Sequence, residues 1–472
     1  MSICFRKGVR GGYLFKNIQG TPKANFEEMK IPKYVVIPFT QGFGEQTKPL
    51  VNVGDKVKAG QMIGKGDKGI SSPIHATVNG KVREIREIEY RGKKTLAAIV
   101  DSDSSTEVVT LDGAKKDLSK FSQESMSRLL YLSGVTSLGA TGLPTLEASS
   151  SLSMDKVKFL VVSALETQPF AIPTGLVYQS KVSEICQALQ ALQKFYKDIP
   201  VYVGVSQKDK KFAQSLRDSL SQSKNIEIHV LSHKYPQDFP EILTETLTGV
   251  CVPDGEKPDS VGSVVLDIAD LMAVYHALSE GMPLVSRWIS LGGSGYKENK
   301  LVRVRIGTPA SEILAQFGKP GVETRFLLGD PLTGDVAQDL ALTPVGREIK
   351  STSCIEEDAK RHFLFFMRPG LRADSYSRIF ASSYLPLEKK LDTNLHGEHR
   401  PCIQCSYCED ICPRPLLPNM LHRYCSHGMA EEAKGLRLMG CIECGLCSYV
   451  CPSKISIMRD IQKGKEELKK EL

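Results

Sequence analysis

The feature that most constrains this chain is a pair of cysteine runs near its end. Nine of its 13 cysteines lie between Cys402 and Cys451, and eight of these repeat the spacing C-x2-C-x2-C-x3-C-P. The first run holds Cys402, Cys405, Cys408 and Cys412, and the second holds Cys441, Cys444, Cys447 and Cys451. Gaps of two residues allow one tight loop to present three thiolates to a cubane of iron and sulfide. The repeated spacing therefore predicts two [4Fe–4S] clusters.

The prolines that end both runs predict crossed ligation, because the fourth cysteine of such a run serves the other cluster in two-cluster proteins. One cluster would be held by Cys402, Cys405, Cys408 and Cys451, and the other by Cys441, Cys444, Cys447 and Cys412. Crossing would place the clusters close together, as a two-step path for electrons. Two zinc sites are the alternative, since C-x2-C pairs also bind zinc, but zinc knuckles do not usually need the remaining cysteines and the C-P endings. The remaining five cysteines are predicted to be packed thiols: Cys4, Cys186, Cys251, Cys354 and Cys425.

Composition narrows the class of protein. With 472 residues, 41% of them hydrophobic and 24% charged, the chain reads as a soluble protein of about three domains. The N-terminus is too polar for a signal peptide, and no apolar stretch is long enough to span a membrane. Clustered cysteines without an export signal indicate metal binding in a reducing compartment. The net charge of +7 is spread out, which argues against nucleic acid and leaves room for an acidic redox partner.

Hydrophobic patterning predicts a multidomain α/β protein. Short apolar runs separated by turn residues predict a small β unit, and alternating strand and helix patterns predict a parallel α/β domain after it. The predicted segments are an N-terminal segment (1–33), a barrel-sandwich hybrid (34–102), a parallel α/β domain (103–284), a β-grasp module (285–350), a connecting segment (351–395) and a helical ferredoxin domain with two clusters (396–472). The first β unit resembles lipoyl domains, and Lys68 lies near the place of their modified lysine. We expect it to be structural.

Longer motifs resemble the C subunit of the Rnf electron-transport complex. These are SPIHATVNGKV, RWISLGGSGYKENKLVRVRIGTPASEIL with its β-grasp (SLBB-like) module, and the cysteine tail CIQCSYCEDICPRPLLP with GCIECGLCSYVCPSKI. The resemblance implies an iron–sulfur subunit of an ion-translocating oxidoreductase, peripheral on the cytoplasmic side of the cell membrane. It would pass electrons between NADH or ferredoxin and membrane-embedded flavoprotein subunits.

Other segments resemble the A subunit of the sodium-translocating NADH:quinone reductase, namely SALETQPF, GDPLTGD and MRPG. That protein lacks the cysteine tail. The alternatives are therefore an A-type scaffold with added clusters, acting toward quinone, or a soluble protein resembling cobalamin reductases.

The Rnf resemblance also implies an FMN or NADH site at a Gly-rich loop, G-x-G-G-A-G-F-P-T, followed by a lysine. Here residues 137–145 keep only part of that pattern, with Ser137 and Ala140 in place of glycines and Ala148 in place of the lysine. The acidic motif after the next strand is reduced to Glu166. The candidate cofactor-binding residues are Gly139, Gly142, Thr145 and Glu166. A structural turn without a ligand is the alternative.

The remaining candidate residues are predicted to be structural or solvated rather than functional. Residues 291–297 are predicted to form a hairpin turn rather than a phosphate loop, and His276 is predicted to be packed in a helix. His396, His399, Glu409 and Asp410 flank the first cysteine run and are predicted to be solvated. No arrangement of Ser, His and Asp suggests hydrolysis, so no catalytic residue is assigned.

Overall fold

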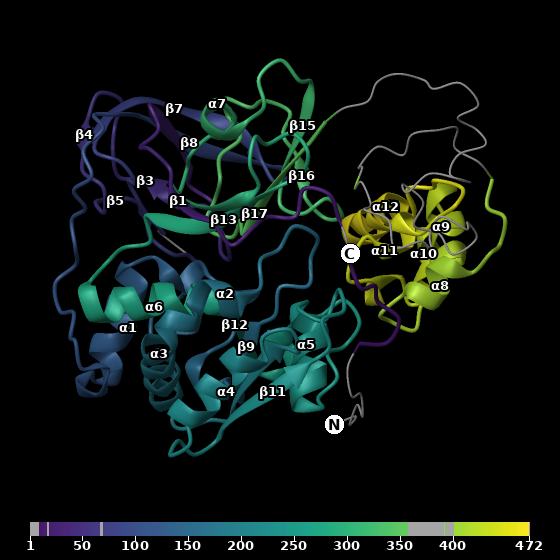
Figure 1. Cartoon of the computed structure of the whole chain (residues 1–472), viewed down its shortest axis with the longest axis horizontal. Helices are drawn as coiled ribbons and strands as arrows, with labels where there is room; N and C mark the ends of the chain where they lie inside the picture. Colours follow the sequence, from purple (N-terminus) through teal and green to yellow (C-terminus); the bar gives the residue numbers. More distant parts are fainter. Residues whose placement is uncertain (1–8, 17, 67–68, 357–390, 392–400, 472) are drawn as a thin grey trace.

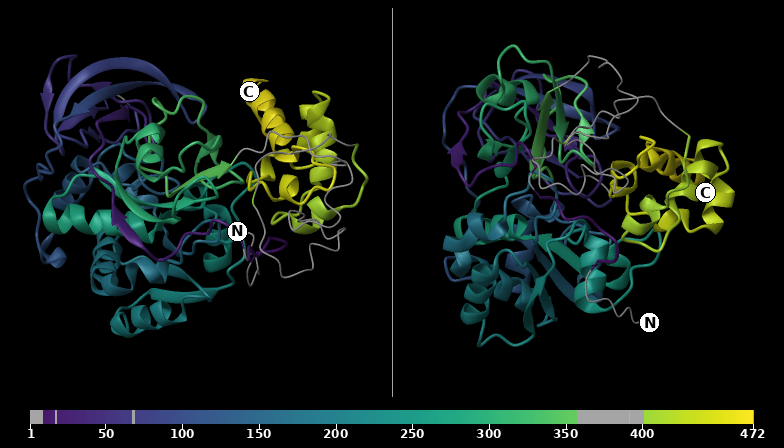
Figure 2. Two further views of the ribbon diagram at one scale, coloured as in Figure 1. Left: turned by 45° about the horizontal axis from the view of Figure 1, so that its top comes forward. Right: turned by 45° about the vertical axis from the view of Figure 1, so that its right-hand side comes forward.

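The computed structural model describes residues 9–16, 18–66, 69–356, 391 and 401–471. The predictions for Cys4, Lys68, His396, His399 and most of the connecting segment lie outside these residues. Figure 1 shows the helical domain that carries the cysteines beside a larger body, and both views of Figure 2 keep it to one side. No described helix combines the length and apolar character that a membrane span needs.

The first domain packs two small antiparallel sheets around one core. One sheet has the order β2-β8-β7-β4 and the other β3-β5-β6. Their bounds are β2 (Tyr34–Pro38), β3 (Lys48–Pro49), β4 (Lys56–Val57), β5 (Met62–Lys65), β6 (Ile74–His75), β7 (Gly80–Tyr90) and β8 (Lys93–Ser102). Val35, Ile37, Ile63 and Val100 fill the space between the sheets. The turn-punctuated apolar runs therefore form the predicted sandwich.

The central domain is a parallel sheet of order β11-β10-β9-β12, with every pair parallel as predicted. The strands are β9 (Phe159–Ala164), β10 (Val201–Ser206), β11 (Ile226–Leu231) and β12 (Ser263–Asp267). The helices are α1 (Gln123–Leu132), α2 (Thr174–Tyr178), α3 (Val182–Phe195), α4 (Lys210–Ser219), α5 (Pro240–Thr248) and α6 (Ile268–Glu280). Alternate residues of β9 face two cores: Leu160 and Val162 pack toward α3 and α6, whereas Val161 packs toward α5. A strand buried on both faces explains its continuous apolar run. His276 on α6 is partly buried: its side chain is 40% exposed, and its Nδ1 lies 3.2 Å from the carboxylate of Glu280.

The third unit is a mixed sheet of order β1-β14-β13-β17-β15-β16, with one helix, α7 (Ala310–Phe317). The strands are β1 (Phe26–Glu28), β13 (Ser286–Gly292), β14 (Lys300–Arg305), β15 (Thr324–Leu328), β16 (Asp335–Val336) and β17 (Ser351–Glu356). β13 and β14 pair antiparallel, so the segment 293–299 that joins them is a hairpin connection, and residues 291–292 end β13. β1 and β17 come from segments that the sequence analysis placed outside this unit.

The helical domain contains α8 (Tyr407–Ile411), α9 (Pro418–Ser426), α10 (Ala430–Gly435), α11 (Leu446–Tyr449) and α12 (Ile457–Glu471). The gap between the cysteine runs is helical, as predicted. Cys425 is buried in the core of this domain, and a Cβ on Gly464 of α12 would lie 2.4 Å from its sulfur. Cys425 is therefore a packed thiol that α9 presses against α12, as predicted.

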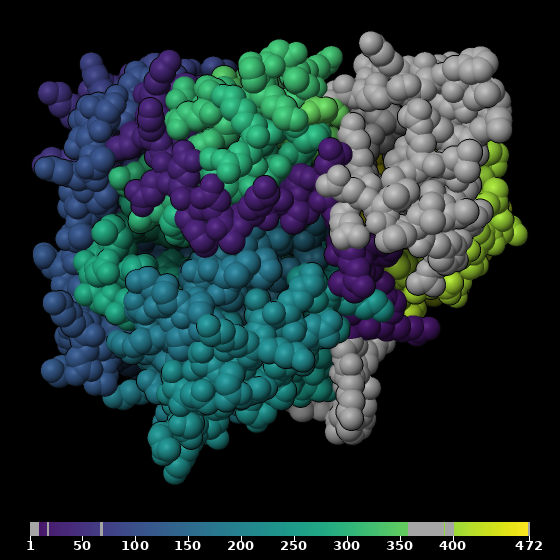
Figure 3. All heavy atoms as spheres, in the orientation of Figure 1, coloured from purple at the N-terminus to yellow at the C-terminus, as the bar shows by residue number. Residues whose placement is uncertain are grey.

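An arm formed by residues 9–16 joins the first part of the chain to the last. Gly12 donates its N–H to the carbonyl of Ile411 (2.8 Å), and Tyr13 forms a bridge with Tyr235 of the central domain. The ring of Tyr13 lies 5.4 Å from that of Tyr449 on α11. In Figure 3 the N-terminal part of the chain crosses the surface between the mixed sheet and the central domain and then reaches the helical domain.

Arg347 fastens three segments of the body together. Its side chain is only 1% exposed. One nitrogen donates to the carbonyl of Gly134 (3.1 Å) and to the hydroxyl of Ser137 (3.2 Å), and another donates to the carbonyl of Pro73 (2.7 Å). Because buried acceptors without donors are costly, this side chain holds the first domain against the segment that follows α1.

Replacing Arg347 with Met should lower the free energy of unfolding by roughly 2 kcal/mol, because the buried acceptors lose their donors. The melting temperature measures this loss. Arg86→Met is the matched control, since Arg86 is about half exposed and its loss should change stability by at most about 0.5 kcal/mol. Equal melting temperatures for the two variants would contradict the role given to Arg347.

Candidate functional site

Two cavities in the helical domain are lined by the predicted cysteines. The inner cavity is lined by Cys412, Cys441, Cys444 and Cys447. The outer cavity is lined by Cys402, Cys405, Cys408 and Cys451. Each cavity thus takes three cysteines from one run and the fourth from the other. We call the first cavity inner because its lining contacts the central domain.

The two runs fold as repeats of one another. Residues 404 and 406 of the first run, and 443 and 445 of the second, all have left-handed backbone. Those turns direct three thiols of each run inward, and a short helix follows each of them, α8 and α11 respectively. Only the second run has a glycine at the later turn, Gly445, whereas Ser406 adopts φ +58° with a side chain. The same local conformation therefore builds both cavities.

Backbone amides point at several of the thiols. The N–H groups of Arg414 and Leu416 face Cys412, and the N–H of Glu443 lies 3.4 Å from the sulfur of Cys441. Donors of this kind stabilise thiolates and tune a bound cluster.

Without iron, burial disfavours the thiolates. Burial raises the pKa of Cys408 to about 12 and that of Cys412 to about 11. These two thiols are therefore protonated near neutral pH in the protein alone, and iron must displace their protons to bind.

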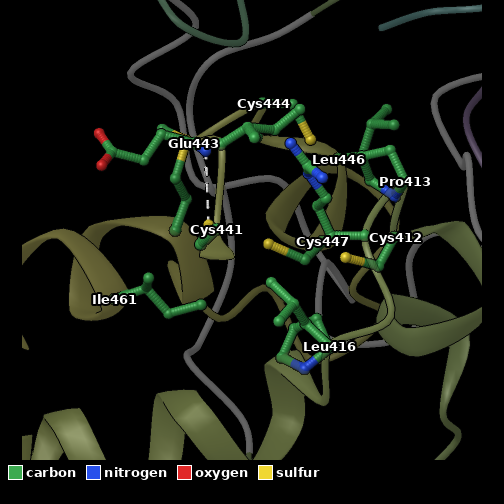
Figure 4. A pocket seen from close by; sticks show the side chains of 14 residues that line it. Cys412, Pro413, Leu416, Cys441, Glu443, Cys444, Leu446, Cys447 and Ile461 are labelled. Carbon is green, nitrogen blue, oxygen red and sulfur yellow. Dashed lines mark hydrogen bonds between the residues drawn. The ribbon is translucent and has the colours of Figure 1, made fainter. Parts of the chain in front are cut away.

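Figure 4 shows how the inner cavity is arranged. The sulfurs of Cys412, Cys444 and Cys447 turn toward a common space, whereas the carboxylate of Glu443 points away from it. Within the described ranges, no three His, Cys, Asp or Glu side chains are grouped closely enough for a single metal ion. The donor set around each cavity, four thiols in a mainly apolar lining, fits a [4Fe–4S] cluster.

The inner cavity is attached to the central domain. The hydroxyl of Tyr235 donates to the carbonyl of Cys444 (2.7 Å). Arg414, which lines the cavity, pairs with Glu245 of α5 at 2.5 Å, and both side chains are buried. Arg437 holds Asp254 through two hydrogen bonds of 2.6 and 2.9 Å. These contacts fix the inner cavity against the central sheet.

The Gly-rich loop is closed by the chain's own atoms. A Cβ on Gly139 would lie 2.4 Å from the carbonyl oxygen of Val265, and one on Gly142 would lie 2.6 Å from the ring of Phe43. Both glycines have positive φ. Protein packing thus accounts for the glycines at these two positions, so their presence is not by itself a sign of a phosphate site.

Two hydroxyls of this loop are also taken up internally. The hydroxyl of Ser137 accepts from Arg347, and that of Thr145 lies 2.8 Å from the hydroxyl of Ser149. Neither hydroxyl is left to point at a ligand.

Glu166 lies in a separate, polar cavity where β9 and β12 end against the mixed sheet. Its lining includes Glu166, Tyr178, Asp267, Arg287, Trp288 and Lys350, but not Gly139, Gly142 or Thr145. Lys350 lies 2.7 Å from Asp267, and Arg287 lies 3.8 Å from Asp270. Of the four candidate nucleotide-binding residues, this cavity therefore contains only Glu166.

Asp267, Arg287 and Lys350 were not predicted from the sequence. Asp267 carried a usable signal, because it ends a buried parallel strand, and ligands of open α/β sheets bind beyond the carboxyl ends of the strands. Arg287 and Lys350 carried none, since they reach the cavity from β13 and from the residue before β17.

Glu166→Gln should change how stability depends on pH. Burial raises the pKa of Glu166 from 4.5 to about 8, so between these values the folded protein holds a proton that the unfolded chain has lost. The contribution of this group to wild-type stability therefore falls as the pH rises through that window, and Gln does not titrate. The melting temperature of the variant minus that of the wild type should rise from pH 5 to pH 8. The exposed Glu124→Gln is the control, and a pH-independent difference for Glu166→Gln would contradict the burial.

Three family models match successive parts of the chain. They describe the RnfC barrel sandwich hybrid domain (residues 4–105), the Nuo51 FMN-binding domain (131–276) and the 4Fe-4S dicluster domain (401–456). A solved NAD+-reducing [NiFe]-hydrogenase in the H2-reduced state aligns at 11% identity and a TM-score of 0.41, over 53% of this chain and 52% of that chain. That likeness is too slight to carry an argument.

Curated relatives align with most of the chain. It is 27% identical over 424 residues to the C subunit of the ion-translocating oxidoreductase complex of Klebsiella pneumoniae (strain 342), covering 89% of this chain and 51% of that protein. The protein of the same name from Salmonella newport (strain SL254) is 27% identical over 422 residues, covering 89% and 52%. The chain thus spans about half the length of these relatives. The resemblance to the C subunit of the Rnf-type ion-translocating oxidoreductase, predicted from the sequence, is confirmed over most of this chain.

Proposed function

We propose that this chain is an iron–sulfur electron-transfer subunit of an ion-translocating oxidoreductase of the Rnf type. The observation that carries the proposal is the pair of cavities, each lined by four cysteines drawn from both runs. The match to a 4Fe-4S dicluster domain and the name of the relatives support it. The bound clusters would supply one-electron transfer.

The ligands we propose follow the cavities. The inner cluster would be held by Cys412, Cys441, Cys444 and Cys447, and the outer cluster by Cys402, Cys405, Cys408 and Cys451. The protein would exclude water from the inner thiols, fix both sets of ligands with short helices and adjust the potentials through the amides that face the sulfurs. Because the fourth ligand of each cluster comes from the other run, the fold would hold the clusters near one another.

The body would then serve to place this redox domain in a larger assembly. We propose that it docks, on the cytoplasmic side of the membrane, onto membrane-embedded subunits of the same complex. NADH or ferredoxin would be the donor, and flavoprotein subunits or quinone the acceptor. The relatives are named as subunits of a complex, which supports this placement. We assign the lipoyl-like first domain and the mixed sheet with α7, as a β-grasp (SLBB-like) module, to docking.

A second candidate is an A-type scaffold in which the body binds no nucleotide and the clusters are an added path. The closed Gly-rich loop favours it, because Gly139 and Gly142 pack against protein atoms. If a donor does bind to the body, the polar cavity of Glu166 is the better place for it. Bound flavin that is lost on replacing Glu166 would favour the first candidate, and a body that holds no flavin would favour the second.

Anaerobic purification followed by iron, sulfide and flavin analysis tests the proposal. We expect about eight iron atoms and eight sulfides per chain and no flavin retained by the loop. Zinc without acid-labile sulfide would overturn the electron-transfer function. Flavin that survives replacement of Glu166 but is lost on closing the loop further, for example in Gly142→Val, would restore the loop as a nucleotide site.

Crossed ligation makes a sharper prediction about paired variants. Cys412→Ser should abolish the same reduced-state EPR signal as Cys441→Ser, and Cys451→Ser the same signal as Cys402→Ser. Each should lower the iron content from about eight atoms toward about four. If Cys412→Ser instead matched Cys402→Ser, each run would serve its own cluster. Cys425→Ser is the control, because that thiol is buried away from both cavities, and it should keep its full iron content.

A further inference from the structure

The two cysteine cavities differ in the charge that surrounds them. Arg414 lines the inner cavity and is only 8% exposed. One of its terminal nitrogens is paired with Glu245, while its Nε has no hydrogen-bond partner among the described atoms. Glu245 is not among the lining residues. A buried donor without an acceptor is costly, so a group absent from the protein alone would have to supply the acceptor.

A second buried cation lies behind the same cavity. Lys465 of α12 is 8% exposed and donates to the carbonyl of Cys441 (2.6 Å) and to the carboxylate of Glu443 (2.7 Å). Gln462 also donates to that carboxylate (3.0 Å), which points away from the sulfurs in Figure 4. The ammonium group of Lys465 is thus hydrogen-bonded to the backbone of Cys441, a predicted cluster ligand, whereas the carboxylate of Glu443 that balances its charge is directed away from the cavity.

The outer cavity has no such cations. Its polar lining consists of Ser406, Asn419, His422 and Ser453 together with the cysteines, and no Lys or Arg is among the described residues that line it. His422 lies 2.6 Å from Asp460, which gives that ring an anionic neighbour. Glu409 and Asp410 follow Cys408 on α8 and are exposed, as predicted. In contrast to the inner cavity, the outer one is therefore lined by no described arginine.

Nearby charge and hydrogen bonds decide how easily a cluster accepts an electron. Reduction adds negative charge, so a buried cation or an N–H donated to a sulfur stabilises the reduced state and raises the potential. Burial strengthens the effect because water screens it less.

We propose that Arg414, supported by Lys465, sets the inner cluster at a higher potential than the outer cluster. Arg414 would donate its free Nε–H to a sulfur of the inner cluster. An electron on the reduced outer cluster would then pass to the oxidised inner cluster, with no proton transferred, and come to rest beside the central domain. This inference rests on the proposed function, since it requires both clusters to be present.

The test compares two changes at the inner cavity, each with one cation removed. Arg414→Gln combined with Glu245→Gln removes the cation without leaving its partner buried alone, and Lys465→Met removes the second cation. Lys463→Met, an exposed lysine on the same helix, is the matched control. Iron content and EPR-monitored redox titration of the full chain are the measurements. Cys402→Ser in each background removes the outer signal and identifies the inner one.

In the double variant the reduction potential of the inner cluster should fall by at least about 59 mV. For a one-electron couple this is a tenfold change in the equilibrium distribution of the electron. The inner potential should fall in the same direction in Lys465→Met, while the outer potential and the Lys463→Met control do not move. Full iron content with unchanged inner potentials, or a shift confined to the outer cluster, would overturn the inference and leave the proposed function standing. Wild-type protein without iron would overturn the proposed function instead. If the double variant loses iron, comparing the inner potential of Lys465→Met with that of Lys463→Met still tests the inference.

Discussion

The constraint on which the helical domain depends is that Cys412 must lie beside Cys441 while Cys451 returns to Cys402. Each cavity takes its fourth cysteine from the other run, so neither run can form a complete ligand set alone. The pairing of α9 with α12, across the buried Cys425 and Gly464, brings the two runs to that position. The packing of the helical segment between the two cysteine runs therefore decides whether the eight thiols can line the two cavities.

In the body, a glycine-rich pattern can serve either ligand binding or internal packing. Glycines with positive φ allow close approach, and the sequence alone does not say to what. Here Gly139 approaches the backbone of β12 and Gly142 approaches Phe43, while Arg347 bonds Ser137 where the related loops have glycine. This loop, whose sequence resembles a nucleotide site, here packs between the first domain and the central sheet. By contrast, the cavity of Glu166 is lined by several charged side chains.

Local patterns predicted the elements, and long-range contacts decided the rest. The cysteine spacing predicted both ligand sets that now line the cavities, and alternating apolar runs predicted the parallel sheet. The strand β1 was missed because a three-residue segment such as Phe26–Glu28 becomes a strand only when a sheet edge is offered to it. The strand β17 was missed because it lies between β13 and β15, which come from earlier in the chain. Arg287 and Lys350 meet Asp267 only after two domains pack, and no local signal at either of these two residues foretells that.

The arm of residues 9–16 bears on how the molecule is made. Its partners include Tyr235, Ile411 and Tyr449, so the native contacts of the arm are complete only when the cysteine runs have been synthesised. Contacts this distant in sequence form late, since closing long loops carries an entropic cost. The sandwich and the parallel sheet can fold while synthesis continues, whereas the arm must wait. Fastening the helical domain to the body is therefore a late step in assembly, taken when the thiols that receive iron already exist.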